Sequence, residues 1–178
     1  MILYLPKHFD ENEWFILVSM AIMFLLICLF PKRLHFVHVL SIWLLNIYLA
    51  YTVDYSLDHP PTFLYFSNDS NKYEVFDSFI YYILYPGSMY LFITGLVSFP
   101  FLRKHRFLYV CCVCIVTAVV EYFAHLMHVF TYVHWSIWYS LIAYIPLFSI
   151  NVGFYYFVSN HVFRLHNQNS IDKPLAKR

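Results

Sequence analysis

Five long apolar stretches, separated by short polar segments, dominate the pattern of hydrophobic and polar positions along this chain of 178 residues. Each is close to the roughly 20 residues that a helix needs to cross the hydrocarbon core of a bilayer. Because backbone groups in hydrocarbon must pair within their own segment, we expect all five stretches to be helices. The predicted spans are Trp14–Phe30, Leu34–Val53, Phe76–Phe99, Phe107–His128 and Ser136–Val158.

The polar segments between and after the spans are short, with one exception. Residues 54–75 form the one substantial predicted loop, which carries the turn-forming pair Pro60-Pro61. The polar tail, residues 166–178, is predicted to be flexible. No internal repeat or change of composition divides the chain. The pattern therefore predicts a single all-α domain over residues 1–178, a polytopic transmembrane bundle of five helices.

Composition supports this class and narrows the partners. Hydrophobic residues make up 61% of the chain and charged residues 12%, whereas soluble domains contain about 25% charged residues. The net charge of +1 provides no basic field that would attract nucleic acid. The expected partner is the lipid bilayer, with a homo-oligomer or a membrane partner protein as further candidates, and no nucleic acid is expected.

The distribution of Lys and Arg predicts how the bundle is oriented. Of the 11 such residues, nine fall on one side of the five spans, and the remaining two are Lys7 and Lys72. Lys and Arg accumulate in cytoplasmic loops. We therefore predict a multi-pass protein of the cell (plasma) membrane with its N-terminus outside and its C-terminus inside.

One predicted span carries three titratable side chains in the stretch VVEYFAHLMH, residues 119–128. On a continuous helix, Glu121, His125 and His128 fall within about 60° of arc and form one polar stripe. A charged acid in hydrocarbon costs at least a few kcal/mol. Glu121 is therefore expected either to be protonated and donate a hydrogen bond, or to stay ionised beside a cation, a protonated histidine or a water-filled cavity.

Other polar side chains cluster at the predicted outer end of the bundle. Asp54 and Asp77 join the stripe as candidates for an ion or proton site. Carboxylates and imidazoles suit a divalent metal such as Zn, Mn or Fe, so Glu121, His125 and His128 are candidate metal ligands and a divalent metal is the candidate cofactor. A structural hydrogen-bond network and a functional ion or proton site both remain open. The supporting polar residues are Asn46, Tyr85, Tyr132, His134, Tyr139 and Ser140.

Several motifs in residues 30–145 carry a resemblance to a known family. They are FPKR after the first span, VDYSLD after the second, YFSNDSNKYEVFDSFIYYILYPGSMYLF into the third, and EYFAHLMHVFTYVHWSIWYS from the fourth into the fifth. Together they resemble a family of small five-helix integral membrane proteins of spore-forming bacteria related to Bacillus and Clostridium. The resemblance implies a five-helix bundle in a bacterial plasma membrane and supplies no mechanism. His125 and His128 lie outside the family pattern, which leaves Glu121 as the stronger site candidate.

The sequence contains no serine in an identifiable nucleophile context, so no catalytic residue is predicted. The first expectation is a non-enzymatic membrane protein whose polar cluster around Glu121 organises the bundle or senses pH or a cation, since histidine titrates in the physiological range. A small proton- or ion-coupled transporter component is one alternative. A membrane-embedded metalloenzyme is the other, although the ligand spacing differs from the HExxH pattern.

Overall fold

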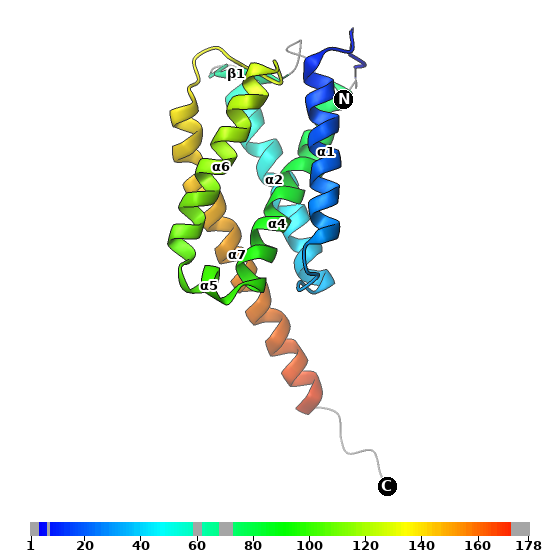
Figure 1. The fold of residues 1–178 in the computed structure, drawn as a ribbon. Coiled ribbons are helices and arrows are strands. Elements are labelled where there is room, and N and C mark those ends of the chain that lie inside the picture. Colours follow the sequence, from blue (N-terminus) through cyan, green and yellow to red (C-terminus); the bar gives the residue numbers. More distant parts are fainter. Residues whose placement is uncertain (1–3, 7, 59–61, 68–72, 172–178) are drawn as a thin grey trace.

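The computed structural model describes residues 4–6, 8–58, 62–67 and 73–171 (Figure 1). Most of these residues are helical, and two short strands pair with each other. The helical elements are α1 (Glu11–Leu29), α2 (Phe36–Asp58), α3 (Val75–Phe79), the π-helix η1 (Ile80–Leu84), α4 (Tyr85–Ser98), α5 (Pro100–Lys104), α6 (Arg106–Leu126) and α7 (Ile137–Ile171). The strands are β1 (Tyr65–Ser67) and β2 (Phe130–Tyr132).

Five helical segments are long and apolar enough to cross a membrane, which confirms that the five predicted stretches are helices of this kind. Two helices continue past the predicted spans. α2 ends at Asp58, four residues beyond the predicted start of the loop, and α7 reaches Ile171 within the segment predicted as a flexible tail. The five segments are Glu11–Leu29, Phe36–Val53, Val75–Ser98, Arg106–Leu126 and Ile137–His161.

A small antiparallel sheet, which was not predicted from the sequence, lies at one end of the bundle. Tyr65 of β1 faces Tyr132 of β2, and Ser67 faces Phe130. The carbonyl of Leu64 accepts hydrogen bonds from the two backbone N–H groups that follow β2, each at 2.9 Å. The sheet therefore joins the segment after α2 to the connection between α6 and α7. We call this the β1–β2 end and the opposite end, where α5 lies, the α5 end (Figure 1).

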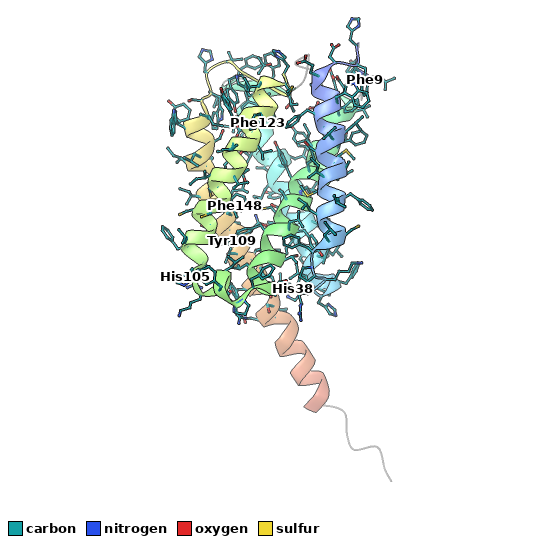
Figure 2. All side chains as sticks on the ribbon, viewed as in Figure 1. Phe9, His38, His105, Tyr109, Phe123 and Phe148 are labelled. Carbon is teal, nitrogen blue, oxygen red and sulfur yellow. The ribbon has the colours of Figure 1, made fainter. Side chains whose placement is uncertain are left out.

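The third span lies at the centre of the bundle. In an apolar 18-residue stretch of this span, 61% of the residues are buried, against 11–22% in the corresponding stretches of the other four. α4 packs against α1, α2 and α7. On the α5 side, the ring of Phe92 in α4 stacks on Tyr109 at 5.2 Å between centroids and meets Phe148 edge-on at 4.8 Å (Figure 2). The other four spans keep most of their apolar surface on the outside of the bundle.

The two prolines predicted to lie inside spans are accommodated differently. Pro86 stands at the start of α4, directly after the π-helical turn η1, in which the N–H of Tyr85 donates to the carbonyl of Ile80. Proline has no N–H, and its ring crowds the preceding turn, so a wider turn in front of it relieves that crowding. The third span is therefore disturbed by a π-helical turn in front of Pro86. Pro146 lies inside the continuous helix α7.

Two buried asparagines, Asn46 and Asn151, tie α2 to α7. The side-chain amides of Asn46 and Asn151 hydrogen-bond each other in both directions, at 2.7 and 3.1 Å. Each amide also donates to the carbonyl four residues earlier in its own helix. Polar pairs of this kind between spanning helices contribute about 0.6–2 kcal/mol. The pair fixes the register of two helices that are far apart in the sequence.

Candidate functional site

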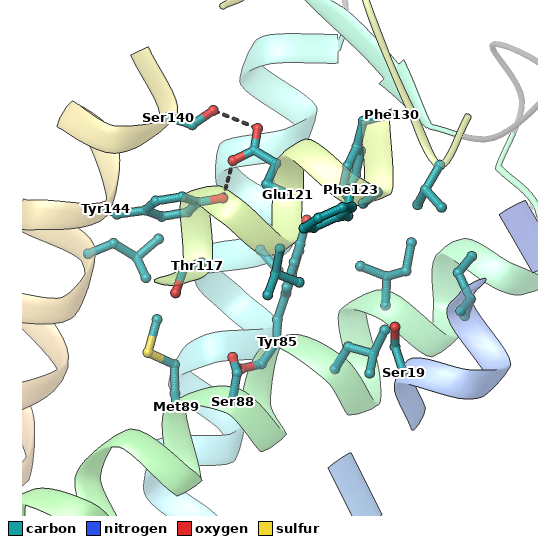
Figure 3. Close-up of a pocket in the computed structure, with 18 of the residues that line it drawn as sticks. Ser19, Tyr85, Ser88, Met89, Thr117, Glu121, Phe123, Phe130, Ser140 and Tyr144 are labelled. Atoms are coloured by element: carbon teal, nitrogen blue, oxygen red, sulfur yellow. Dashed lines mark hydrogen bonds between the residues drawn. The ribbon is translucent and has the colours of Figure 1, made fainter. Parts of the chain in front are cut away.

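The carboxylate of Glu121, on the last turns of α6, is the centre of a hydrogen-bonded cluster. Tyr132 of β2 and Ser140 of α7 each donate a hydroxyl hydrogen bond to Oε1, at 2.6 Å. Tyr144, one turn further along α7, donates to Oε2 (Figure 3). We call Glu121, Tyr132, Ser140 and Tyr144 the Glu121 cluster. It links three elements, α6, β2 and α7, through a single side chain.

The directions of these hydrogen bonds match an ionised carboxylate. Trp135 donates its indole N–H to the oxygen of Ser140 at 2.7 Å, so the hydroxyl hydrogen of Ser140 is free to point at Glu121. Each tyrosine hydroxyl carries one hydrogen, which it gives to the same carboxylate. An ionised carboxylate only accepts, and bonds donated to it are stronger than neutral ones. Three donors therefore satisfy the charged form of Glu121.

Tyr132 is held in its donor form by its surroundings. Burial, followed by the hydrogen bond to Glu121 and the nearby negative charge, raises the pKa of the Tyr132 phenol above its usual value. The phenol therefore keeps its proton throughout the physiological pH range. The ring of His125 stacks on Tyr132 with centroids 4.2 Å apart and planes 10° from parallel. This stacking fixes the ring from which the donor projects.

The Glu121 cluster forms part of the wall of a cavity of about 590 Å³ at the centre of the bundle (Figure 3). This volume is within the usual range for small-molecule sites. Most of the wall is apolar and comes from α1, α2, η1, α4, α6 and α7. Among the described residues that line the cavity, Glu121 is the one charged side chain. The cavity therefore combines a long apolar interior with one acidic position.

Aromatic rings surround the acidic end of this cavity. Tyr65 of β1 lies 5.9 Å from Trp135 and 6.3 Å from Phe130, measured between ring centroids. All three rings line the cavity, together with Tyr85 from the start of α4. Tyr65, Phe130 and Trp135 lie in or next to the small sheet and therefore at the β1–β2 end. The sheet thus supplies the aromatic part of the site.

The two histidines predicted to join Glu121 take other positions: His128 lies away from the carboxylate, and His125 borders the Glu121 cluster only through Tyr132. α6 ends at Leu126, and His128 follows the helix with a φ of 58° and an exposed side chain. His125 remains on the helix, where its Nδ1 pairs with the carbonyl of Phe130 at 2.7 Å. The predicted stripe of three side chains is therefore interrupted, because its arc assumed a helix continuing to His128.

A divalent metal does not fit these residues. The described part of the chain contains no group of three His, Cys, Asp or Glu side chains that could hold a metal ion. The oxygens of Glu121 already accept three hydroxyl hydrogen bonds, and Nδ1 of His125 is taken by a backbone carbonyl. The candidate metal set of Glu121, His125 and His128 is therefore not assembled in this fold.

The predicted carboxylates at the neighbouring helix ends have separate positions. Asp77 is buried at the third position of α3, where its Oδ2 accepts the backbone N–H of Glu74 at 2.7 Å. This reciprocal capping satisfies backbone donors at the start of the helix. The backbone of Asp54 belongs to α2, while its side chain lies outside the described residues. Asp77 thus has a structural role at the start of the third span.

Four of the six predicted supporting residues belong to the site. Tyr132 and Ser140 contact Glu121 directly, and Asn46 and Tyr85 line the cavity. The other two, His134 and Tyr139, are exposed.

Two residues of the site were not predicted from the sequence, namely Tyr144, which donates to Glu121, and Trp135, which orients Ser140. Tyr144 follows Ser140 by four residues, so both lie on one helical face, and this spacing was a usable signal.

No protein-family model, curated protein or solved structure matches the chain. Its class therefore follows from the fold and site alone. It is a helical protein with five segments able to span a membrane, which enclose an apolar cavity with one carboxylate in its wall.

Proposed function

We propose that the protein is a multi-pass protein of the plasma membrane that binds a small apolar or amphipathic molecule in its central cavity without transforming it chemically. The Glu121 cluster then has two tasks, which are to hold α6, β2 and α7 together and to form the polar end of the binding site. The resemblance to the five-helix family of spore-forming bacteria agrees with this location. The observation that carries the proposal is a three-donor carboxylate in the wall of a cavity of about 590 Å³.

The proposed orientation places the N-terminus and the β1–β2 end outside and the α5 end in the cytoplasm. The basic residues Arg103, Lys104 and Arg106 in and next to α5 support it. Green fluorescent protein, which fluoresces when it folds in the cytoplasm, should be bright when fused after Arg178. Alkaline phosphatase at the same position should be inactive. Active phosphatase and a dark fluorescent protein would reverse the orientation.

The binding proposal is tested by photolabelling in phosphatidylcholine vesicles. The probe is decanol carrying a diazirine on its alkyl chain, and labelled positions are mapped by peptide mass spectrometry. We expect labelling to concentrate on cavity residues of α1, α4 and α6. Ser19 lines the cavity from α1, so Ser19→Phe should reduce this labelling by about five-fold or more, since a ring would occupy part of the site.

The matched control is Ala21→Phe, which places the same ring on the same helix. Ala21 is exposed and lies on a different face from Ser19, outside the cavity wall. Its labelling should equal that of the wild type. Uniform labelling of all outward-facing residues, insensitive to Ser19→Phe, would show that the probe reports only its partition into lipid and would refute a cavity site.

A small proton- or ion-coupled transporter is the second candidate function. It is favoured by the polar side chains of Ser88 and Thr117, which line the same cavity as Glu121. The same vesicles separate the two functions, because a transporter moves protons or ions across the membrane whereas a binding protein does not. The metalloenzyme alternative gains no support, since the described residues do not fit a metal.

A further inference from the structure

We propose that the cavity selects a membrane-soluble organic ammonium ion, with the cationic nitrogen beside Glu121 and the apolar body along α1, α2 and α4. This inference rests on the proposed function, because it names the class of ligand for the same cavity. It follows from three independent features of the site, namely a carboxylate that no Lys or Arg among the described residues neutralises, the aromatic rings and the position of the opening.

The charge of Glu121 is not balanced by the described cations. The described Lys and Arg residues lie towards the α5 end. Along α6 alone, Arg106 is about 22 Å from Glu121 at 1.5 Å per residue. The three hydroxyl donors stabilise the carboxylate without cancelling its charge. In surroundings of low dielectric constant, such a charge attracts a cation far more strongly than it would in water. An anionic ligand would be repelled.

The rings at the β1–β2 end suit the same kind of ligand. The faces of Trp and Tyr attract cations within about 6 Å, and groups of such rings recognise ammonium ions. Tyr65, Trp135 and Phe130 line this end of the cavity and pack against one another. An alkylammonium ion satisfies both a carboxylate and aromatic faces. An inorganic divalent cation would instead require several oxygen ligands, and the cavity wall contains one carboxylate.

The opening of the cavity indicates that the ligand arrives from the membrane phase. Val18 and Ile22 of α1 line one side of it, and Val120 and Phe123 of α6 line the other. These four side chains are 50–53% exposed, so the cavity reaches the surface between α1 and α6. Figure 1 shows these two helices on either side, with α2 and α4 between them. The rim is apolar, which favours entry of a molecule dissolved in hydrocarbon.

The experiment uses the full chain in phosphatidylcholine vesicles at pH 7 and measures displacement of the diazirine-bearing decanol. The competitors are decylamine, decanol and decanoate, which share one chain and differ in head group. A primary amine is protonated at this pH. In the wild type, decylamine should displace the probe at an about ten-fold lower concentration than decanol, as one charge-assisted contact implies. Decanoate should be the weakest competitor.

Variants identify the carboxylate as the source of this preference. In Glu121→Gln, which keeps the size and removes the charge, decylamine and decanol should compete equally. Glu11→Gln removes an exposed acid outside the cavity wall and should keep the ten-fold preference, which controls for the general attraction of amines to the protein. The wild-type comparison stands even where Glu121→Gln fails to fold.

The outcomes separate this inference from the proposed function. Absence of cavity labelling by the probe overturns the proposed function and, with it, the inference. If the probe labels the cavity of the wild type but decylamine and decanol displace it equally, the proposed binding function stands and the proposal of an ammonium ligand is overturned. A preference for decylamine that persists in Glu121→Gln also overturns it, because the selectivity would then come from another part of the membrane or protein.

Discussion

Replacing Glu121 with alanine is expected to lower the free energy of unfolding by roughly 3–5 kcal/mol, because three hydroxyl donors lose their acceptor together. A buried donor left without a partner costs about 1–3 kcal/mol. Ser140 is buried, whereas Tyr132 is half-buried, so the hydroxyl of Tyr132 can form a hydrogen bond with water more easily. The expected loss of stability is therefore smaller than the sum of three separate penalties. Unfolding in mixed micelles with increasing sodium dodecyl sulfate measures the effect.

Two further variants test whether this loss of stability comes from the Glu121 cluster. Glu121→Gln keeps one acceptor oxygen, so it should retain part of the cluster and lose roughly half as much stability. Val119→Ala changes an exposed side chain on the same helix and should stay within about 0.5 kcal/mol of the wild type. Equal stability of Glu121→Ala and Val119→Ala would show that the cluster does not hold α6, β2 and α7 together.

Replacing Gly95 with alanine is expected to destabilise the centre of the bundle, because α4 and α6 meet there without room for a side chain. A Cβ atom at this position would lie 2.5 Å from the hydroxyl oxygen of Tyr109. That hydroxyl donates to the carbonyl of Phe92 at 3.0 Å, and the two rings stack. Moving Tyr109 therefore disturbs both contacts, and overpacking of this kind costs about 1–3 kcal/mol.

Gly153 provides the matched control for this prediction. It lies inside α7, and a Cβ atom there would meet nothing within 4 Å. Both substitutions gain the same helix propensity, about 1 kcal/mol, so the difference between them isolates the clash. Gly95→Ala should be less stable than Gly153→Ala by about 1–3 kcal/mol, and the gap should narrow in a Tyr109→Phe background. An unchanged gap in that background would exclude the hydroxyl as its cause.

Local features of the sequence were sufficient to predict the helical framework. The length and hydropathy of a segment decide whether it can span a membrane, so the predicted spans agree within three residues with the segments able to do so, although α2 and α7 continue further as helix. Asn46 and Asn151 were predictable as interhelical hydrogen-bonding groups for the same reason, since an amide inside an apolar helix needs a partner. That they pair with each other depends on the packing of α2 against α7, which the sequence alone does not specify.

The site was predictable only in part, because its geometry depends on contacts between distant segments. The cost of burying an acid singled out Glu121, and nearness to the helix ends singled out Tyr132 and Ser140. The pairing of β1 with β2 brings together residues about 65 positions apart, and no local pattern specifies that register. The end of α6 before His128 was not predicted either; there the N–H of Val129 donates to the carbonyl of Ala124, and His128 has a φ of 58°.

The central position of the third span also bears on how the chain is made. This span has the lowest mean hydropathy of the five and is the most enclosed by protein. During synthesis it follows α1 and α2, two of the helices against which α4 packs. In the proposed multi-pass membrane protein, part of the binding surface for this least lipophilic segment is therefore already in the bilayer when the segment leaves the ribosome. The order of the helices in the gene thus allows the nascent chain to shelter this segment from lipid before α6 and α7 exist.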